Sequence, residues 1–235
     1  MFFDWTYVVL VLPAIFLSLW ASANVNSTFK RYSSQFSRRH ITGAQAAEQV
    51  LRANGIYDVS VQHIAGNLTD HFDPKNKVIR LSDNVYNSTS TAAIGVACHE
   101  AGHAVQHQVG YAPLKLRMAV IPVTNIGSKL AMPLILLGLV LSAFGYYFYE
   151  LVYVGIACFG LSLVFQVITL PVEFNASSRA VQAIEQSGIL VEDEMTGAKR
   201  TLRAAALTYV AATAVSLAQL LRLLILFGGN NRRRD

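Results

Sequence analysis

Three long runs without a charged residue constrain this chain more than any other feature of its sequence. They occupy residues 6–25, 131–149 and 151–172. A helix needs roughly 20 apolar residues to cross the hydrocarbon core of a bilayer, and each run reaches or approaches that length. Only 14% of all residues are charged, whereas soluble domains carry about 25%. The sequence therefore predicts a membrane protein.

A fourth run, residues 204–221, is a weaker candidate because Arg222 separates it from the apolar residues 223–227. Its hydropathy favours a short span over a helix lying in the membrane interface, so we expect about four transmembrane helices. The first run could instead be a cleaved signal peptide. However, Asp4 stands where a signal peptide carries basic residues, which favours a retained anchor.

The basic residues lie beside these runs. Four follow the first run and three precede the last: Lys30, Arg31, Arg38, Arg39, Lys199, Arg200 and Arg203. Such clusters are typical of cytoplasmic segments that face anionic lipid. The net charge of +5 is therefore explained by a lipid bilayer as partner and gives no reason to expect nucleic acid.

The polar segment after the first run is predicted to form a small domain of helices and strands, which makes the chain a mostly helical α+β membrane protein. Thr42 and residues 88–90 offer helix N-caps, and Gly110 can end the second helix. We expect helices over residues 43–53 and 91–108, a strand over residues 56–64, and a hairpin formed by residues 68–72 and 78–81.

The second of these helices carries the pattern His-Glu-x-x-His at residues 99–103. Residues four apart share one helix face, about 6 Å apart along the axis, so His99 and His103 can bind one tetrahedral zinc ion. Glu100 can then be the general base that takes a proton from a water activated by the metal and passes it to the leaving amine. The pattern predicts hydrolysis that depends on a metal.

The alternative is a helix with ordinary structural histidines, because a five-residue pattern arises by chance in many chains. The flanking residues are small or apolar, which indicates a buried helix: Val96, Ala97, Ala101, Gly102, Ala104 and Val105. Burying two histidines and a glutamate without a partner is unfavourable. We therefore expect one zinc ion per chain.

A catalytic zinc ion needs a third protein ligand and one open position. His107 lies on the same helix, but about 12 Å beyond His99 along the axis and rotated by roughly 80°, so it is expected to support a ligand or simply to pack. Glu173 is the better candidate. The runs 131–149 and 151–172 form a hairpin of spans that returns the chain to the face it left. The motif helix and Glu173 should therefore lie on the same side of the membrane.

Three segments carry a resemblance to a known family. HEAGHAVQH, DHFDPKNKVIRLSDNVY and LPVEFNASSRA resemble the YugP-type membrane zinc metallopeptidases, which are similar in layout to HtpX-like proteases, and the resemblance covers roughly residues 30–205. It implies a small gluzincin-like zincin domain in which His99, His103 and Glu173 bind zinc and Glu100 is the base.

Other polar residues are weaker candidates. HtpX-like proteins usually carry Asp four residues after the ligand Glu, whereas this chain has Ser177, so Asn175 is a candidate for orienting a ligand. His71 and Arg179 could stabilise the developing oxyanion, although a turn histidine and a surface arginine are equally good interpretations. We also expect the strand over residues 78–81 to be an exposed edge to which an extended peptide substrate adds.

These features divide the chain into five segments. We expect an N-terminal transmembrane anchor (1–25), a first catalytic part with the motif helix (26–118), a two-span hairpin (119–172), a second catalytic part with the third ligand (173–203), and a C-terminal transmembrane or interfacial helix with a basic tail (204–235). Cys98 and Cys158 fit neither a disulfide framework nor a cysteine-based zinc site, so both should pack as small apolar residues.

The basic clusters share the side of the motif helix, whereas residues 1–4 and 144–150 carry no basic residue. The positive-inside rule then predicts a multi-pass protein of the cell membrane with a cytoplasmic catalytic face. The arginines at 232–234 are an exception if the last segment spans.

Two functions follow from these residues. The first is a zinc-dependent endopeptidase that cuts membrane or membrane-adjacent proteins, and the alternative is a non-catalytic membrane scaffold with a structural zinc. Glu100 favours the enzyme, because a structural zinc site is closed by four ligands and needs no neighbouring base. The oligomeric state, the substrate and the gating of the site stay open at this point.

Overall fold

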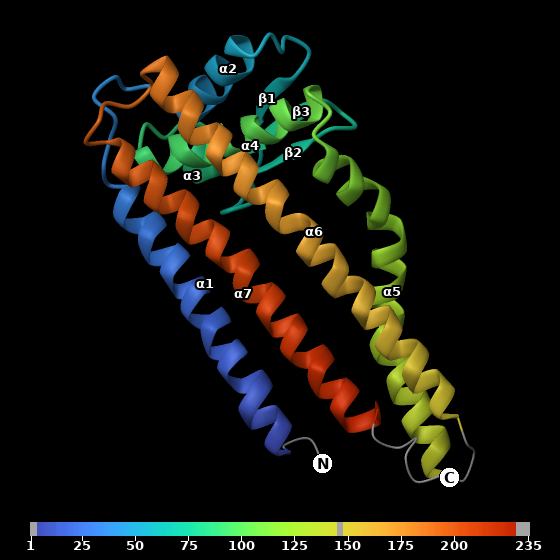
Figure 1. The fold of residues 1–235 in the computed structure, drawn as a ribbon. Coiled ribbons are helices and arrows are strands. Elements are labelled where there is room, and N and C mark those ends of the chain that lie inside the picture. The colour runs from blue at the N-terminus through green and yellow to red at the C-terminus, as the bar shows by residue number, and fades with distance from the viewer. Residues whose placement is uncertain (1–3, 145–147, 229–235) are drawn as a thin grey trace. The chain divides into compact units, whose positions relative to one another are not determined.

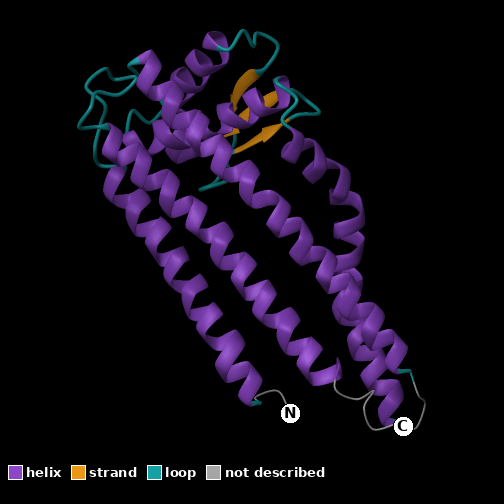
Figure 2. Cartoon of the chain, in the orientation of Figure 1, coloured by secondary structure: helices purple, strands orange, loops and turns teal. Residues whose placement is uncertain are grey.

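The computed structural model describes residues 4–144 and 148–228, and the chain falls into two compact units. Unit 1 contains Met1–Trp20, Leu116–Leu170 and Tyr209–Asp235, and unit 2 contains Ala21–Lys115 and Pro171–Thr208. The described secondary structure is mostly helical, with three short strands in unit 2 (Figure 2). The predicted combination of many helices and a small sheet is confirmed.

The elements follow one another along the chain as Figure 1 shows. The helical elements are η1 (Tyr7–Val11, a π-helix), α1 (Leu12–Tyr32), α2 (Gly43–Ala53), α3 (Asp83–Tyr86), α4 (Thr91–Gln108), α5 (Ala112–Ala143), α6 (Tyr149–Ser187) and α7 (Met195–Gly228). The strands are β1 (Ser60–His63), β2 (His71–Asp73) and β3 (Val78–Leu81).

Local hydrogen bonds fix the ends of the two helices predicted in unit 2. Thr42 caps α2 through a capping box with Gln45, in which each side chain accepts from the backbone of the other. Ser90 Oγ accepts from Ala93 N at 3.2 Å and so caps α4. Gly110 follows α4 with a φ of 64°, a left-handed conformation that suits glycine. Both helices therefore have the predicted boundaries.

The sheet of unit 2 has the strand order β1-β3-β2. β2 and β3 are antiparallel and form the predicted hairpin, whereas β1 runs parallel to β3. β1 is shorter than the predicted strand over residues 56–64, because Ile56 N donates to Leu51 O at the end of α2. Strand pairing begins only at Ser60.

The prediction that residues 78–81 form an exposed edge is wrong, because β3 is the central strand of the sheet. Its backbone pairs with β1 on one side and with β2 on the other. Val78, Ile79 and Leu81 are buried. The edge strands are β1 and β2, so an added peptide strand would have to pair with one of these.

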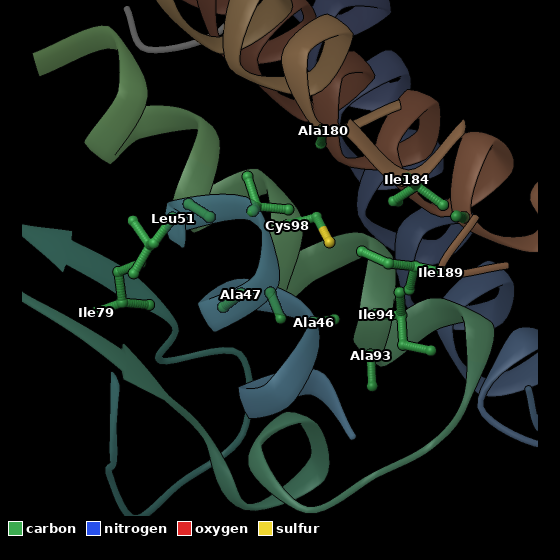
Figure 3. Close-up of a cluster of buried hydrophobic side chains, with 14 of the residues drawn as sticks. Ala46, Ala47, Leu51, Ile79, Ala93, Ile94, Cys98, Ala180, Ile184 and Ile189 are labelled. Carbon is green, nitrogen blue, oxygen red and sulfur yellow. The ribbon is translucent and has the colours of Figure 1, made fainter. Parts of the chain in front are cut away.

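The apolar core of unit 2 gathers around α4. Figure 3 shows side chains of α2, β3, α4, α6 and the connection after α6 packed together: Ala46, Ala47, Leu51, Ile79, Ala93, Ile94, Cys98, Ala180, Ile184 and Ile189. Cys98 lies among them, and burial raises the pKa of its thiol to about 12. Cys98 is thus a packing residue, as predicted, and Cys158 of unit 1 is a free, partly buried thiol.

In unit 1, α5 and α6 pack as antiparallel neighbours through glycines. A Cβ on Gly138 of α5 would lie 3.0 Å from Val152 N, and a Cβ on Gly155 of α6 would lie 2.8 Å from Ala131 O. Later residues of α6 thus meet earlier residues of α5. Small residues let helix backbones approach closely in an apolar environment, where packing is the main attraction between helices. The predicted antiparallel pairing of these helices is confirmed.

The last apolar run belongs to α7, and its charged residue is neutralised within unit 1. Arg222 Nη2 donates to Asp4 Oδ2 at 2.9 Å, and the guanidinium lies over the Tyr7 ring, 5.4 Å from its centroid. The side chains of Arg222 and Asp4 are only 11% and 19% exposed. Arg222, which weakened the prediction of a span, is therefore paired by the N-terminal segment.

Within the described residues, four helical stretches are long and apolar enough to cross a membrane: Tyr7–Tyr32, Ala112–Ala143, Tyr149–Ser187 and Met195–Gly228. The second differs from the predicted run over residues 131–149, since α5 begins well before Lys129 and ends at Ala143. A search for uncharged runs stops at this lysine, although the helix continues through it. The arginines at 232–234 lie outside the described residues.

Candidate metal centre

α4 presents the motif histidines on an otherwise apolar helix. The rings of His99 and His103 lie edge to face, with centroids 4.7 Å apart. Their side chains are only 14% and 13% exposed. The neighbouring Ala97, Ala101 and Ala104 are buried. The helix is therefore buried around its polar stripe, as the flanking residues predict.

Gly102 allows α6 to approach this stripe. A Cβ on Gly102 would lie 2.7 Å from Ala176 O, so the backbones of α4 and α6 touch at a position where no larger residue fits. Val172, Ala176 and Ala180 form a fully buried stripe on α6. Glu173 is the residue after Val172 and is 2% exposed. The close approach of the two helices thus carries Glu173 to the histidines.

Three donor atoms converge at this point. Glu173 Oε2 lies 3.3 Å from His99 Nε2 and 3.6 Å from His103 Nε2. Ligand atoms of the three residues all lie within 4.8 Å of one another. The ligands of a tetrahedral zinc ion, with bonds of about 2.0–2.1 Å, stand roughly 3.3 Å apart. The chemistry and the spacing of these donors therefore fit a zinc ion.

The second nitrogen of each imidazole also has a partner. His99 Nδ1 lies 3.1 Å from Ser177 Oγ, and His103 Nδ1 lies 3.0 Å from Gln106 Oε1. Nε2 of each ring is therefore the nitrogen that faces Glu173. Histidine ligands of metals are generally held by a hydrogen bond at their other nitrogen. Ser177 supplies a hydroxyl at the position where HtpX-like proteins carry a carboxylate.

The electrostatic surroundings favour a cation. Burial by itself would lower the pKa of the His103 imidazole, but the hydrogen bond that Glu173 accepts from it and the charge of Glu100 raise this pKa above its ordinary value. Two carboxylates that stabilise a positive imidazolium stabilise a bound metal cation for the same reason.

Glu100 differs from Glu173 in having no partner. It is 8% exposed, and no hydrogen bond or ion pair joins its carboxylate to another residue in the described parts of the chain. Glu100 also lies close enough to His103 to influence its charge. Its oxygens can therefore accept a proton from a molecule bound beside the histidines.

Of the weaker candidates, Asn175 and Arg179 lie next to the site. Asn175 Oδ1 accepts from Gln106 Nε2 at 3.0 Å and from Arg179 Nε at 2.8 Å. His71 lies on β2 with an exposed side chain, and its Nδ1 is 2.8 Å from Thr69 O. Its described contacts do not include the three candidate ligands, so an oxyanion role for His71 stays a prediction.

His107, the alternative third ligand, packs against the sheet. Its ring lies edge to face with Phe72 of β2, with centroids 6.0 Å apart. The cluster of potential metal ligands in the described residues contains Glu173 and does not contain His107. This arrangement agrees with the geometric argument that one straight helix does not surround an ion.

Gln106 is the residue that sequence reasoning missed. Its side chain is fully buried and reaches His103, Val172 O and Asn175. A buried amide must satisfy its donors and its acceptor. A glutamine three residues after a candidate ligand, on a helix predicted to be buried, is the signal that could have revealed it.

The geometry defines a class of site. Two histidines one helical turn apart, a glutamate from a second helix and an unpaired glutamate beside them are the components of a zinc-dependent hydrolase. Comparison with known proteins leads to the same class. Residues 7–228 match the family described as "Putative neutral zinc metallopeptidase".

The chain belongs to this family of zinc metallopeptidases, as the resemblance found in its sequence predicts. It is 46% identical over 221 residues to "Putative membrane protease YugP" of Bacillus subtilis (strain 168), which covers 94% of this chain and 96% of that relative. No solved structure matches the chain. The membrane relative and the four apolar helical stretches show that the protein associates with membranes.

Proposed function

We propose that this protein is a zinc-dependent endopeptidase that hydrolyses peptide bonds of membrane or membrane-adjacent proteins. The observation that supports this best is the convergence of His99, His103 and Glu173 beside the unpaired Glu100. The three converging residues would hold one zinc ion per chain. Two ligands from the motif helix and a glutamate from a later helix give a gluzincin-like donor set.

Each residue of the site has a separate task. Zinc bound here would supply a Lewis acid that polarises the scissile carbonyl and lowers the pKa of water. Glu100 takes the proton of the attacking water and delivers it to the leaving amine. Arg179, which is connected to the site through Asn175, is a candidate to stabilise the oxyanion, and His71 is another.

The alternative function is a scaffold with a purely structural zinc. Structural zinc sites are closed by four protein ligands. In the described parts of the chain the cluster has three members, which leaves one position for water or substrate. An unpaired buried carboxylate beside the ligands has no use in a scaffold. Both observations support the enzyme.

Glu100→Gln tests the proposal. The variant should keep one zinc per chain and lose cleavage of a casein-like substrate by roughly 10²–10⁴-fold, because an amide accepts no proton. Glu48→Gln on α2 is a matched control, since Glu48 is an exposed carboxylate whose partner is Arg52 on the same helix. Cleavage by Glu100→Gln at the wild-type rate would refute the catalytic role.

We also propose that the four apolar stretches span the membrane and that the catalytic face is cytoplasmic. The basic clusters around Lys30 and Lys199 belong to unit 2, which also contains the candidate ligands. The positive-inside rule places such a unit in the cytoplasm. The pairing of Arg222 with Asp4 supports the last span, because it neutralises the charge inside the apolar run.

Cysteine labelling of intact cells tests this orientation. Tyr57 of unit 2 is 82% exposed and Trp5, shortly before η1 in unit 1, is 68% exposed, so each can carry an accessible cysteine. In a background with Cys158→Ala, a membrane-impermeant maleimide should label Trp5→Cys directly and Tyr57→Cys only after permeabilisation. The reverse pattern would refute the cytoplasmic assignment.

A further inference from the structure

Gln106 connects one candidate ligand to the helix that carries another. Its Oε1 lies 3.0 Å from His103 Nδ1, and its Nε2 donates to Val172 O at 2.8 Å and to Asn175 Oδ1 at 3.0 Å. Val172 is the residue before Glu173. One fully buried amide therefore touches the ring of the first ligand and the backbone beside the second.

The direction of these hydrogen bonds is fixed by two groups, one of which can only donate and the other only accept. The guanidinium of Arg179 can only donate, so Asn175 Oδ1 is the acceptor, and the carbonyl of Val172 can only accept. Gln106 must therefore turn its NH₂ group toward both of them. Its Oε1 is then the atom that faces His103.

The consequence reaches the metal-facing nitrogen. Because Gln106 Oε1 can only accept, His103 Nδ1 must carry the hydrogen. A neutral imidazole with its hydrogen on Nδ1 has its lone pair on Nε2, the nitrogen that faces Glu173. The series of hydrogen bonds from Arg179 through Asn175 and Gln106 thus selects the tautomer of His103 that can bind a metal.

We propose that Gln106 is a positioning residue that holds His103 in this tautomer and fixes the backbone of α6 beside Glu173. The inference deepens the proposed function and rests on its zinc site. His99 is held differently, because the hydroxyl of Ser177 can donate or accept and selects neither tautomer by itself. Gln106 should therefore matter more to metal binding than Ser177.

The test is the dissociation constant for zinc, measured on the purified full-length protein by competition with a chelator. Gln106→Met keeps the size of the side chain and removes its acceptor and donors, so zinc binding should weaken about 10–100-fold. Gln106→Glu keeps an acceptor for His103 but loses both donors to α6, so it should lose some affinity and still bind zinc more tightly than Gln106→Met. Ser177→Ala should lose less affinity than Gln106→Met.

Thr91→Val is the matched control. Thr91 is a fully buried polar residue on the same helix, and its hydroxyl donates to Tyr32 O, away from the candidate ligands. This variant should bind zinc as the wild type does. It separates the loss of any buried hydrogen bond on α4 from the loss of the one at His103.

Wild-type affinity in Gln106→Met would overturn the proposal, and so would equal losses in Gln106→Met and Gln106→Glu. If Gln106→Met does not fold, Gln106→Leu replaces it, because leucine also removes the acceptor that faces His103 and the donors that reach α6. Gln106→Leu should then weaken zinc binding by a similar factor, and unchanged affinity would overturn the proposal. A wild-type protein that binds no zinc would instead refute the proposed function, so the two failures are distinguishable.

Discussion

α6 makes a glycine contact with a neighbouring helix in each unit, and the two contacts have different surroundings. In unit 1, Gly155 lies against Ala131 O of α5, with the apolar Ile135 beside it. In unit 2, Gly102 of α4 lies against Ala176 O. Glu173, His99 and His103 stand directly beside this second contact.

The difference shows that close packing alone does not mark a site. Glycine lets two backbones touch in both places, and in unit 1 this serves only the packing of apolar helices. In unit 2 the same approach brings polar groups from α4 and α6 together in a buried place. There each polar group needs a partner, and a bound cation satisfies several at once. The contact in unit 2 should therefore be coupled to metal binding and the contact in unit 1 should not.

The largest effect is expected from removing Glu173, the candidate ligand on α6. Glu173→Ala leaves the glycine contact intact and removes one of three donors, so the zinc content should fall far below one per chain and peptide cleavage should disappear. His107→Ala, on α4 but packed on Phe72, should keep both. Metal analysis of the purified proteins checks this. Full zinc content in Glu173→Ala would show that the contact between α4 and α6 is not coupled to metal binding.

The second effect separates packing from metal binding. Gly102→Ala and Gly155→Ala both force a Cβ to within 2.8 Å of another atom, so each should destabilise the protein by about 1–3 kcal/mol. Only Gly102→Ala moves Glu173 relative to the histidines, so only this variant should lose zinc affinity, by about 10-fold or more. Thermal melting and zinc titration of both variants distinguish the effects. Equal zinc affinity in the two would contradict the coupling.

The parts of the fold that local signals determine could be predicted from the sequence. The ends of α2 and α4 could be predicted, because Thr42, Ser90 and Gly110 form hydrogen bonds with groups only a few residues away. The central position of β3 could not, because β1 joins it from an earlier part of the chain by parallel pairing. The true extent of α5 could not be predicted either. A search for uncharged runs ends at Lys129, whereas the helix continues through this residue.

The same contrast between local signals and distant contacts applies to the candidate site. The spacing of His99, Glu100 and His103 is local to one helical turn, and the hairpin topology was enough to select Glu173. Gln106 could not be assigned a role, because its partners lie on α6, far along the chain, and only the folded structure brings them together. Physical reasoning from the sequence thus selected the three residues that the structure brings together and missed the residue that contacts one of them.

The smallest expected effects are changes in stability when one ion pair in each unit is broken. Asp4 and Arg222 of unit 1 are largely shielded, whereas Arg38 and Asp193 of unit 2 are 69% and 60% exposed. Asp4→Asn leaves the Arg222 charge in apolar surroundings, so it should lower the free energy of unfolding by more than Asp193→Asn does. Asp193→Asn breaks a solvated pair and should cost less than about 1 kcal/mol. Unfolding in the same lipid nanodiscs measures both. Equal effects would mean that water reaches Arg222 and solvates its charge in unit 1.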